Sequence, residues 1–167
     1  MTGCGSGGST PTVAARPAPF ACPKSVTGAS LASHNPRPGT EEELVPGRPT
    51  RMLVCLYHGL THSGPRRLTA ERRTTEGAAV ETFARYLHGT PGFGDEGCSG
   101  DIRNEALLLF GYPSGPPALV EVSPEGCQSA GNGRAPSVQL VGVGEELIAF
   151  VSAAGVWAEG PGSGGSG

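Results

Sequence analysis

The sequence predicts a small α+β domain, in which an antiparallel sheet with a central hairpin is covered on one face by helices and stapled by disulfides. Short apolar runs bounded by Gly and Pro alternate with stretches of helical periodicity, in the order strand, helix, strand, strand, weaker strand, helix. Five cysteines in a chain of 167 residues add the prediction of disulfides, since a core of this size gains from covalent support.

The first strand is predicted at residues 51–57, because the run RMLVCLY is short, apolar and bounded by Pro49 and Gly59, as is typical of a buried central strand. The Pro-rich residues 20–50 before it are expected to be loop. The polar residues 58–75 after it are also expected to form a solvated loop.

A helix is predicted over residues 76–88, because the apolar side chains there recur at helical spacing. The stripe consists of Val80, Phe83, Ala84 and Leu87. Thr75 is placed to cap the start of this helix, and Gly89 with Pro91 to end it.

The clearest feature is a hairpin, whose strands are expected at residues 105–112 and 118–122 around the turn sequence PSGP. A weaker strand is predicted at residues 138–143. The closing helix is predicted at residues 145–151, because acidic residues occupy its first turn and apolar residues share one face.

Four of the cysteines are expected to form two disulfides, and no pair has the C-x-x-C spacing of a zinc or redox site. Cys98 precedes the hairpin and Cys127 follows it, so folding the hairpin brings them together. Cys22 and Cys55 are then left to staple the Pro-rich arm onto the first strand. The alternative is that Cys55 is a reduced core cysteine in a cytosolic protein.

The remaining cysteine, Cys4, lies in the sequence Met1-Thr2-Gly3-Cys4, which resembles the end of a bacterial lipobox with Met in place of the usual Leu. This predicts an exported protein whose Cys4 is lipidated. The alternative is a cytosolic start followed by a flexible tail. Domain boundaries follow from composition: a disordered Gly/Ser/Pro tether over 1–19, one domain over 20–158, and a flexible tail or cloning linker over 159–167.

Motifs for catalysis and cofactors are weak. His58 and His62 are four residues apart, but the glycines around them break the helix that a metal pair would need. The sequence GFGDEG at 92–97 matches G-x-G-x-x-G, yet it follows a helix instead of a strand. Ser114 falls in a hairpin turn and not in a nucleophile elbow.

The clusters of charged residues also predict no specific binding site. Asp95, Glu96 and Asp101 lack the ligand spacing of a calcium loop. The acidic triplet at 41–43 and the arginines at 66, 67, 72 and 73 are expected to be solvated, although such arginines can meet anionic lipid headgroups or cell-wall polymers. The net charge of −3 and pI of about 5.8 argue against nucleic-acid binding. No catalytic, cofactor or metal residue is therefore predicted.

The segment from Pro46 to Gly133 resembles a domain of exported proteins and lipoproteins of high-G+C Gram-positive (actinobacterial) bacteria. The matching features are the strand LVCLY, the helix near 77–88, Cys98, and the runs LLLFGYPSG and EGC. That group has no assigned activity, so the resemblance implies export and disulfides only.

A fainter resemblance is to secreted subtilisin inhibitors of the same bacteria, which combine a small α+β fold with a Cys-bounded hairpin. Those inhibitors present a scissile bond just after a cysteine. In this chain the corresponding sequence is Cys98-Ser99-Gly100-Asp101, where Gly100 lacks the side chain that a protease pocket would bind. The sequence thus predicts an extracellular, membrane-anchored, non-enzymatic domain that binds an unknown protein or cell-envelope component, with an inhibitor of subtilisin-like proteases as the alternative.

Overall fold

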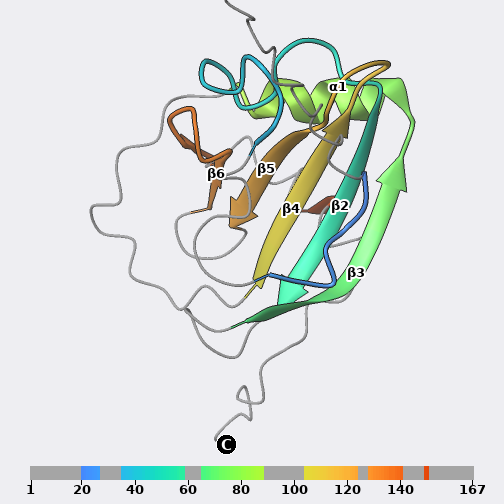
Figure 1. Ribbon diagram of the computed structural model, residues 1–167, viewed down its shortest axis with the longest axis vertical. Coiled ribbons are helices and arrows are strands. Elements are labelled where there is room, and N and C mark those ends of the chain that lie inside the picture. The colour runs from blue at the N-terminus through green and yellow to red at the C-terminus, as the bar shows by residue number, and fades with distance from the viewer. Residues whose placement is uncertain are drawn as a thin grey trace, which may run out of the picture.

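The computed structural model of the chain describes residues 20–26, 35–58, 65–88, 104–123, 128–140 and 149–150. Within these ranges, seven strands form one sheet in the order β1-β3-β2-β4-β5-β6-β7, with every neighbouring pair antiparallel. The strands are β1 (Ser25–Val26), β2 (Arg51–His58), β3 (Arg66–Thr74), β4 (Asn104–Gly111), β5 (Ala118–Ser123), β6 (Ser129–Gly131) and β7 (Val138–Gln139). The sheet curls into a half-barrel, across one end of which lies the helix α1 (Gly77–Tyr86) in Figure 1.

The predicted α+β class is wrong, because the described part of the chain is mostly strand. Strands take 42% of it, against a single short helix, α1. The cause is β3, which occupies residues that were expected to be loop. A central apolar strand needs hydrogen-bond partners along both edges. β4 supplies one edge of β2, and β3 supplies the other.

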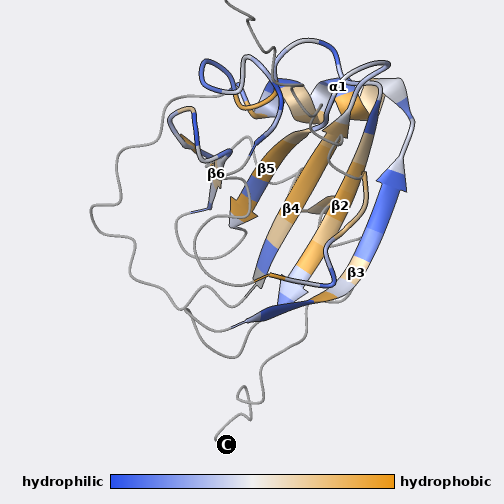
Figure 2. Cartoon of the chain, in the orientation of Figure 1, coloured by the Kyte–Doolittle hydropathy of each residue, from blue (hydrophilic) through white to orange (hydrophobic). Residues whose placement is uncertain are grey.

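The two central strands, β2 and β4, are buried on both faces, and their apolar middle stretches are orange in Figure 2. On one face, alternate residues such as Val54 and Leu108 pack with Val80 and Phe83 of α1. On the other face, Leu53 and its neighbours form a second cluster. That cluster consists of Leu53, Cys55, Tyr57, Leu107, Leu109 and Val26, with Phe20, Cys22, Leu68 and Leu119 partly buried against it.

The second cluster is covered by the segment 20–26, called the N-terminal arm below. The predicted disulfide between Cys22 and Cys55 is confirmed, with the two Cα atoms 5.6 Å apart. The Tyr57 hydroxyl donates a hydrogen bond to the Pro23 carbonyl at 2.9 Å, and β1 adds a short pairing to β3. A covalent bond, a part-buried hydrogen bond and a two-residue strand therefore hold the arm over β2.

β3 has polar side chains on both faces, which explains its hydrophilic colour in Figure 2. Three of its four arginines are engaged by other elements. The Arg72 guanidinium lies 4.3 Å from the centroid of the Phe150 ring, Arg73 lies 5.9 Å from that of Phe20, and Arg66 forms an ion pair with Glu105 of β4. These long-range contacts, together with pairing to β2, place a polar sequence in the sheet.

The hairpin prediction is confirmed, since β4 and β5 pair in antiparallel register around the turn at 113–115. The helix prediction is also confirmed, with Val80, Phe83 and Ala84 buried. The predicted cap at Thr75 is wrong: Glu76 occupies the N-cap without a side-chain cap, and the Thr74 hydroxyl accepts a hydrogen bond from the Glu76 amide at 3.2 Å.

The strand and the helix predicted after residue 137 fall only partly within the described residues. β7 lies within the weaker strand predicted at 138–143, and β1 and β6 are short strands that the sequence did not predict. Of the predicted closing helix, residues 149 and 150 are described, and both are helical. None of the described helices has the length and apolarity needed to cross a lipid bilayer.

Candidate functional site

A groove runs along α1 and is called the α1 groove below. One wall is a line of α1 residues three or four apart, and the other is the segment 47–50 that leads into β2. The groove has a volume of about 480 Å³, and its lining is Gly47, Arg48, Pro49, Thr50, Gly77, Glu81, Ala84, Arg85 and His88. A volume of this size lies within the range of small-molecule sites, about 300–1,000 Å³.

Both walls of the groove are held by the core. Val80 and Phe83 are buried on the neighbouring stripe of α1, which fixes how the helix lies on the sheet. On the opposite wall, the Thr50 amide donates a 2.8 Å hydrogen bond to the Gly111 carbonyl at the end of β4. Gly47 turns the chain there with a φ of +73°, a conformation that favours glycine.

The groove combines a small apolar floor with exposed charged rims. Ala84 is buried at the base, whereas the side chains of Arg48, Glu81, Arg85 and His88 are exposed. Arg48 therefore lies on one wall and Arg85 on the other, and the Glu81 carboxylate lies on the same helix as Arg85. Such a lining can hold an anionic group through the guanidinium forks while an apolar body rests on the floor.

A second, smaller cavity of about 290 Å³ adjoins the end of α1. Its lining shares His88 with the α1 groove and adds Leu87, Glu42, Glu43, Leu44, Ala135, Pro136 and Val138. Within the described residues, no group of three or more His, Cys, Asp and Glu side chains is placed to hold a metal ion.

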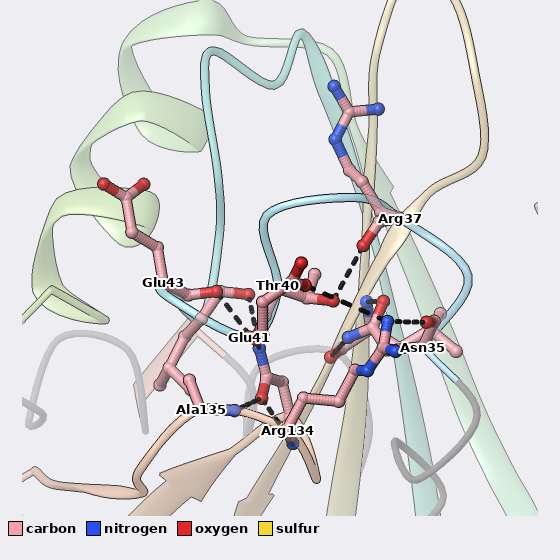
Figure 3. A network of polar contacts seen from close by, with 10 residues as sticks. Asn35, Arg37, Thr40, Glu41, Glu43, Arg134 and Ala135 are labelled. Atoms are coloured by element: carbon pink, nitrogen blue, oxygen red, sulfur yellow. Dashed lines mark hydrogen bonds and ion pairs between the residues drawn. The ribbon is translucent and has the colours of Figure 1, made fainter.

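The loop that carries Glu42 and Glu43 is positioned by Asn132, whose side chain is fully buried. Its amide group donates to the carbonyls of Thr40 at 2.7 Å and Glu43 at 3.1 Å, and its carbonyl oxygen accepts from the amides of Arg134 and Ala135. Figure 3 shows this network between the 35–46 loop and the turn after β6. A single side chain thus joins two segments about ninety residues apart in the sequence.

The same loop is attached to the β4–β5 hairpin. The Asn35 side chain exchanges two hydrogen bonds with the backbone of Leu119 in β5, at 2.7 and 3.2 Å. The Arg37 guanidinium lies 3.2 Å from the centroid of the Tyr112 ring and donates to the Pro116 carbonyl at 3.0 Å. Burial, opposed by the Arg37 charge, raises the pKa of Tyr112 to about 12, so its hydroxyl is neutral at physiological pH.

A buried carboxyl group lies on the arm-covered face of the sheet. Glu105 of β4 is 5% exposed, forms an ion pair with Arg66, and interacts with Glu121 on the adjacent strand β5. Burial, followed by the hydrogen bond and charge of Glu121, raises the pKa of Glu105 to about 8, although Arg66 acts to lower it. Near neutral pH the Glu105 carboxyl therefore favours its protonated form.

Tyr57 faces the same side of the sheet as Glu105, in the neighbouring strand β2. Burial, followed by the negative charge of Glu71, raises the pKa of the Tyr57 phenol. Its hydroxyl therefore stays protonated and keeps its hydrogen bond to Pro23.

Several residues singled out in the sequence lie outside the described ranges. They are Cys4, His62, Asp95, Glu96, Cys98, Asp101 and Cys127. The predicted Cys98–Cys127 disulfide and the loop 98–101 of the inhibitor alternative therefore stay predictions. Of those described, His58 ends β2 opposite Arg67 and Asn104, and Ser114 is exposed in the hairpin turn. The triplet 41–43 is exposed, in agreement with the expected solvated loop.

Sequence reasoning missed Arg48, Arg85, Glu105 and Asn132. Arg48 and Arg85 come together only when α1 packs beside the segment before β2, and no local pattern records that. Glu105 carries a signal that could have been used, because a carboxylate at the start of a strand as apolar as EALLLF is buried with it unless the strand frays.

The geometry therefore points to a binding groove and to the buried carboxyl group of Glu105, but to no chemistry that identifies a family by itself. The resemblance to exported actinobacterial lipoproteins stays a prediction. Comparison with protein-family models, with curated proteins and with solved structures finds no match to this chain.

Proposed function

We propose that this chain is an extracytoplasmic, lipid-anchored, non-enzymatic domain that binds a ligand at the cell envelope. The observation that carries the location is the Cys22–Cys55 disulfide. Stable disulfides are characteristic of oxidising compartments, and cytosolic proteins usually keep such thiols reduced. The bond is built into the fold, since Cys55 is fully buried in the central strand and Cys22 holds the arm over it.

The α1 groove supports the binding role. Its walls are fixed by the core and by the Thr50–Gly111 hydrogen bond, so it is formed before a ligand arrives. Its ionisable side chains are exposed at the rim, where they can contact a ligand from solvent. Buried groups with a shifted pKa are more typical of acid–base catalysis. The carboxyl group with this property, Glu105, is held by an ion pair with Arg66 on the opposite face of the sheet.

The lipid anchor is proposed from the sequence at Cys4. Residues 5–19 between that cysteine and the arm would span at most about 50 Å when fully extended. An acylated Cys4 would then hold the half-barrel near the outer face of the cytoplasmic membrane while leaving the α1 groove accessible.

Thiol trapping tests the location. The protein is expressed from its own gene, and free thiols are alkylated with a membrane-permeant reagent before the cells are opened. We expect Cys22 and Cys55 to be recovered as one disulfide-linked peptide and the protein to be labelled by an impermeant reagent on intact cells. Alkylated Cys22 and Cys55 would contradict the proposed compartment.

The anchor is tested separately by metabolic labelling with a palmitate analogue. We expect the label to be lost in a Cys4→Ala variant, with the variant released from the membrane fraction. A Ser6→Ala variant is the matched control and should label normally. Labelling that survives Cys4→Ala would remove the anchor from the proposal.

A further inference from the structure

We propose that the α1 groove binds a small organic oxyanion, a carboxylate or phosphate attached to an apolar body, held between Arg48 and Arg85. This inference rests on the proposed binding function and specifies the ligand class of the same groove. The observation behind it is that some arginines of the described chain form ion pairs or ring contacts and others do not.

Most described arginines are engaged by another element. Arg66 and Arg134 form ion pairs, and the guanidinium groups of four others lie over aromatic rings: Arg37, Arg51, Arg72 and Arg73. In the described part of the chain, no ion pair within 4.0 Å and no ring contact engages Arg48, Arg67 or Arg85. Two of these three line the same groove, from opposite walls.

The bonding of Arg85 leaves its charge available. Its guanidinium donates to the Thr82 hydroxyl of its own helix at 3.3 Å, a neutral acceptor that does not compensate the positive charge. Arginine presents several N–H donors in a planar fork, which matches the paired oxygens of a carboxylate or phosphate. Guanidinium groups on two facing walls can therefore hold one oxyanion from both sides.

The size and floor of the groove require more than a bare ion. A volume of about 480 Å³ far exceeds that of an inorganic anion, and the lining includes the buried Ala84 together with Pro49 and two glycines. At Gly77, a Cβ atom would meet nothing within 4 Å, so the N-terminal end of the groove is open. An apolar group can occupy this space while its acidic group reaches the arginines.

Glu81 disfavours ligands that carry more than one negative charge. It lies on the same wall of α1, four residues before Arg85. Its carboxylate repels a second acidic group on the ligand, so the groove favours one acidic group over a polyanion. Replacing Glu81 with Gln should therefore tighten anion binding, which is the opposite direction from the arginine variants.

The experiment is an NMR titration of the disulfide-intact chain with sodium benzoate, with phenyl phosphate, and with benzyl alcohol as the neutral analogue. We expect benzoate or phenyl phosphate to shift the amide signals of Gly47, Thr50 and Ala84 saturably, with benzyl alcohol causing much smaller shifts. The stronger of the two anions assigns the acidic group as carboxylate or phosphate.

Variants make the titration specific. Arg48→Gln and Arg85→Gln should each weaken anion binding about tenfold, as expected for the loss of a charge-assisted hydrogen bond. Arg67→Gln removes the same charge from an exposed position on β3, away from the groove, and should leave the affinity unchanged. Glu81→Gln should tighten binding a few-fold. Unfolding midpoints show whether each variant stays folded.

Equal shifts with benzyl alcohol, or equal losses in Arg67→Gln and Arg48→Gln, would overturn the inference. The absence of any saturable shift in a protein that is oxidised and surface-exposed in cells would also overturn it, while the proposed extracytoplasmic location would stand. Reduced thiols in cells together with saturable anion binding would instead contradict the location and leave the groove assignment supported.

Discussion

Glu105 shows how a single buried side chain links this fold to pH. The carboxyl group is enclosed on the arm-covered face of the sheet, where Glu121 favours its protonated form and Arg66 favours its ionised form. Its pKa is raised from 4.5 in the reference state to about 8 in the folded protein. The folded state therefore binds a proton that the unfolded chain releases between these two values.

We predict that this group makes the protein less stable as pH rises. Its contribution is fully present below pH 4.5 and is lost as pH approaches about 8, with a slope of up to about 1.4 kcal/mol per pH unit. Urea unfolding between pH 5 and pH 8.5 measures the slope. Glu105→Gln, which imitates the protonated carboxyl, should flatten it, and the exposed control Glu42→Gln should not. Parallel curves for wild type and Glu105→Gln would contradict the prediction.

Asn132 is the second residue that matters beyond its immediate neighbourhood. Replacing it with Ala removes hydrogen bonds to both the 35–46 loop and the turn after β6 and leaves buried carbonyl and amide groups without partners. We predict a loss of roughly 3 kcal/mol in the free energy of unfolding. Chemical denaturation measures it, with the exposed Gln139→Ala as control. A change below about 1 kcal/mol would show that water replaces the network.

The N-terminal arm is the element whose attachment matters most. It is short and has few backbone contacts with the sheet, so the disulfide carries much of its attachment. The bond joins positions 33 residues apart and restricts the unfolded chain by an amount that grows slowly with that separation.

We predict that the double variant Cys22→Ala/Cys55→Ala loses about 3–4 kcal/mol of stability. Lifting the arm would also uncover Leu53, Tyr57 and Leu109, so we expect increased binding of a hydrophobic dye. Denaturant midpoints and dye fluorescence measure the two effects. Cys4→Ala, which changes a cysteine other than these two, is the control. An unchanged midpoint would mean that the arm is held by its noncovalent contacts.

At the scale of the whole molecule, stability should be graded from the centre of the sheet to its ends. β2 and β4 are enclosed on both faces, whereas β1 and β7 contain two residues each. We predict that amide hydrogens in β2 and β4 exchange slowest and approach the global unfolding free energy. Hydrogen exchange followed by NMR measures this. Equal protection in β7 and β4 would contradict it.

The elements that the sequence predicted are those with local signals. Apolar runs, turn chemistry or helical periodicity within about fifteen residues mark β2, β4, β5 and α1. The Cys22–Cys55 pair was predicted by elimination, once Cys98 and Cys127 had been assigned to the two ends of the hairpin. β3 lacks such a pattern, because its polar side chains gain their partners from β4, the arm and Phe150. The fold class was wrong for that reason. The α1 groove escaped prediction because its walls meet only through tertiary packing.

The two ends of the sheet have a consequence for the behaviour of this protein at high concentration. Long, flat and apolar sheet margins recruit further strands from other molecules and can grow into fibres. Here the described sheet stops at strands of two residues, and the part of β3 that extends beyond β1 presents charged side chains. A strand from another molecule would find only two residues to pair with at β1 or at β7, and charged side chains along the rest of β3. We therefore expect the folded molecule to remain dispersed even at high concentration.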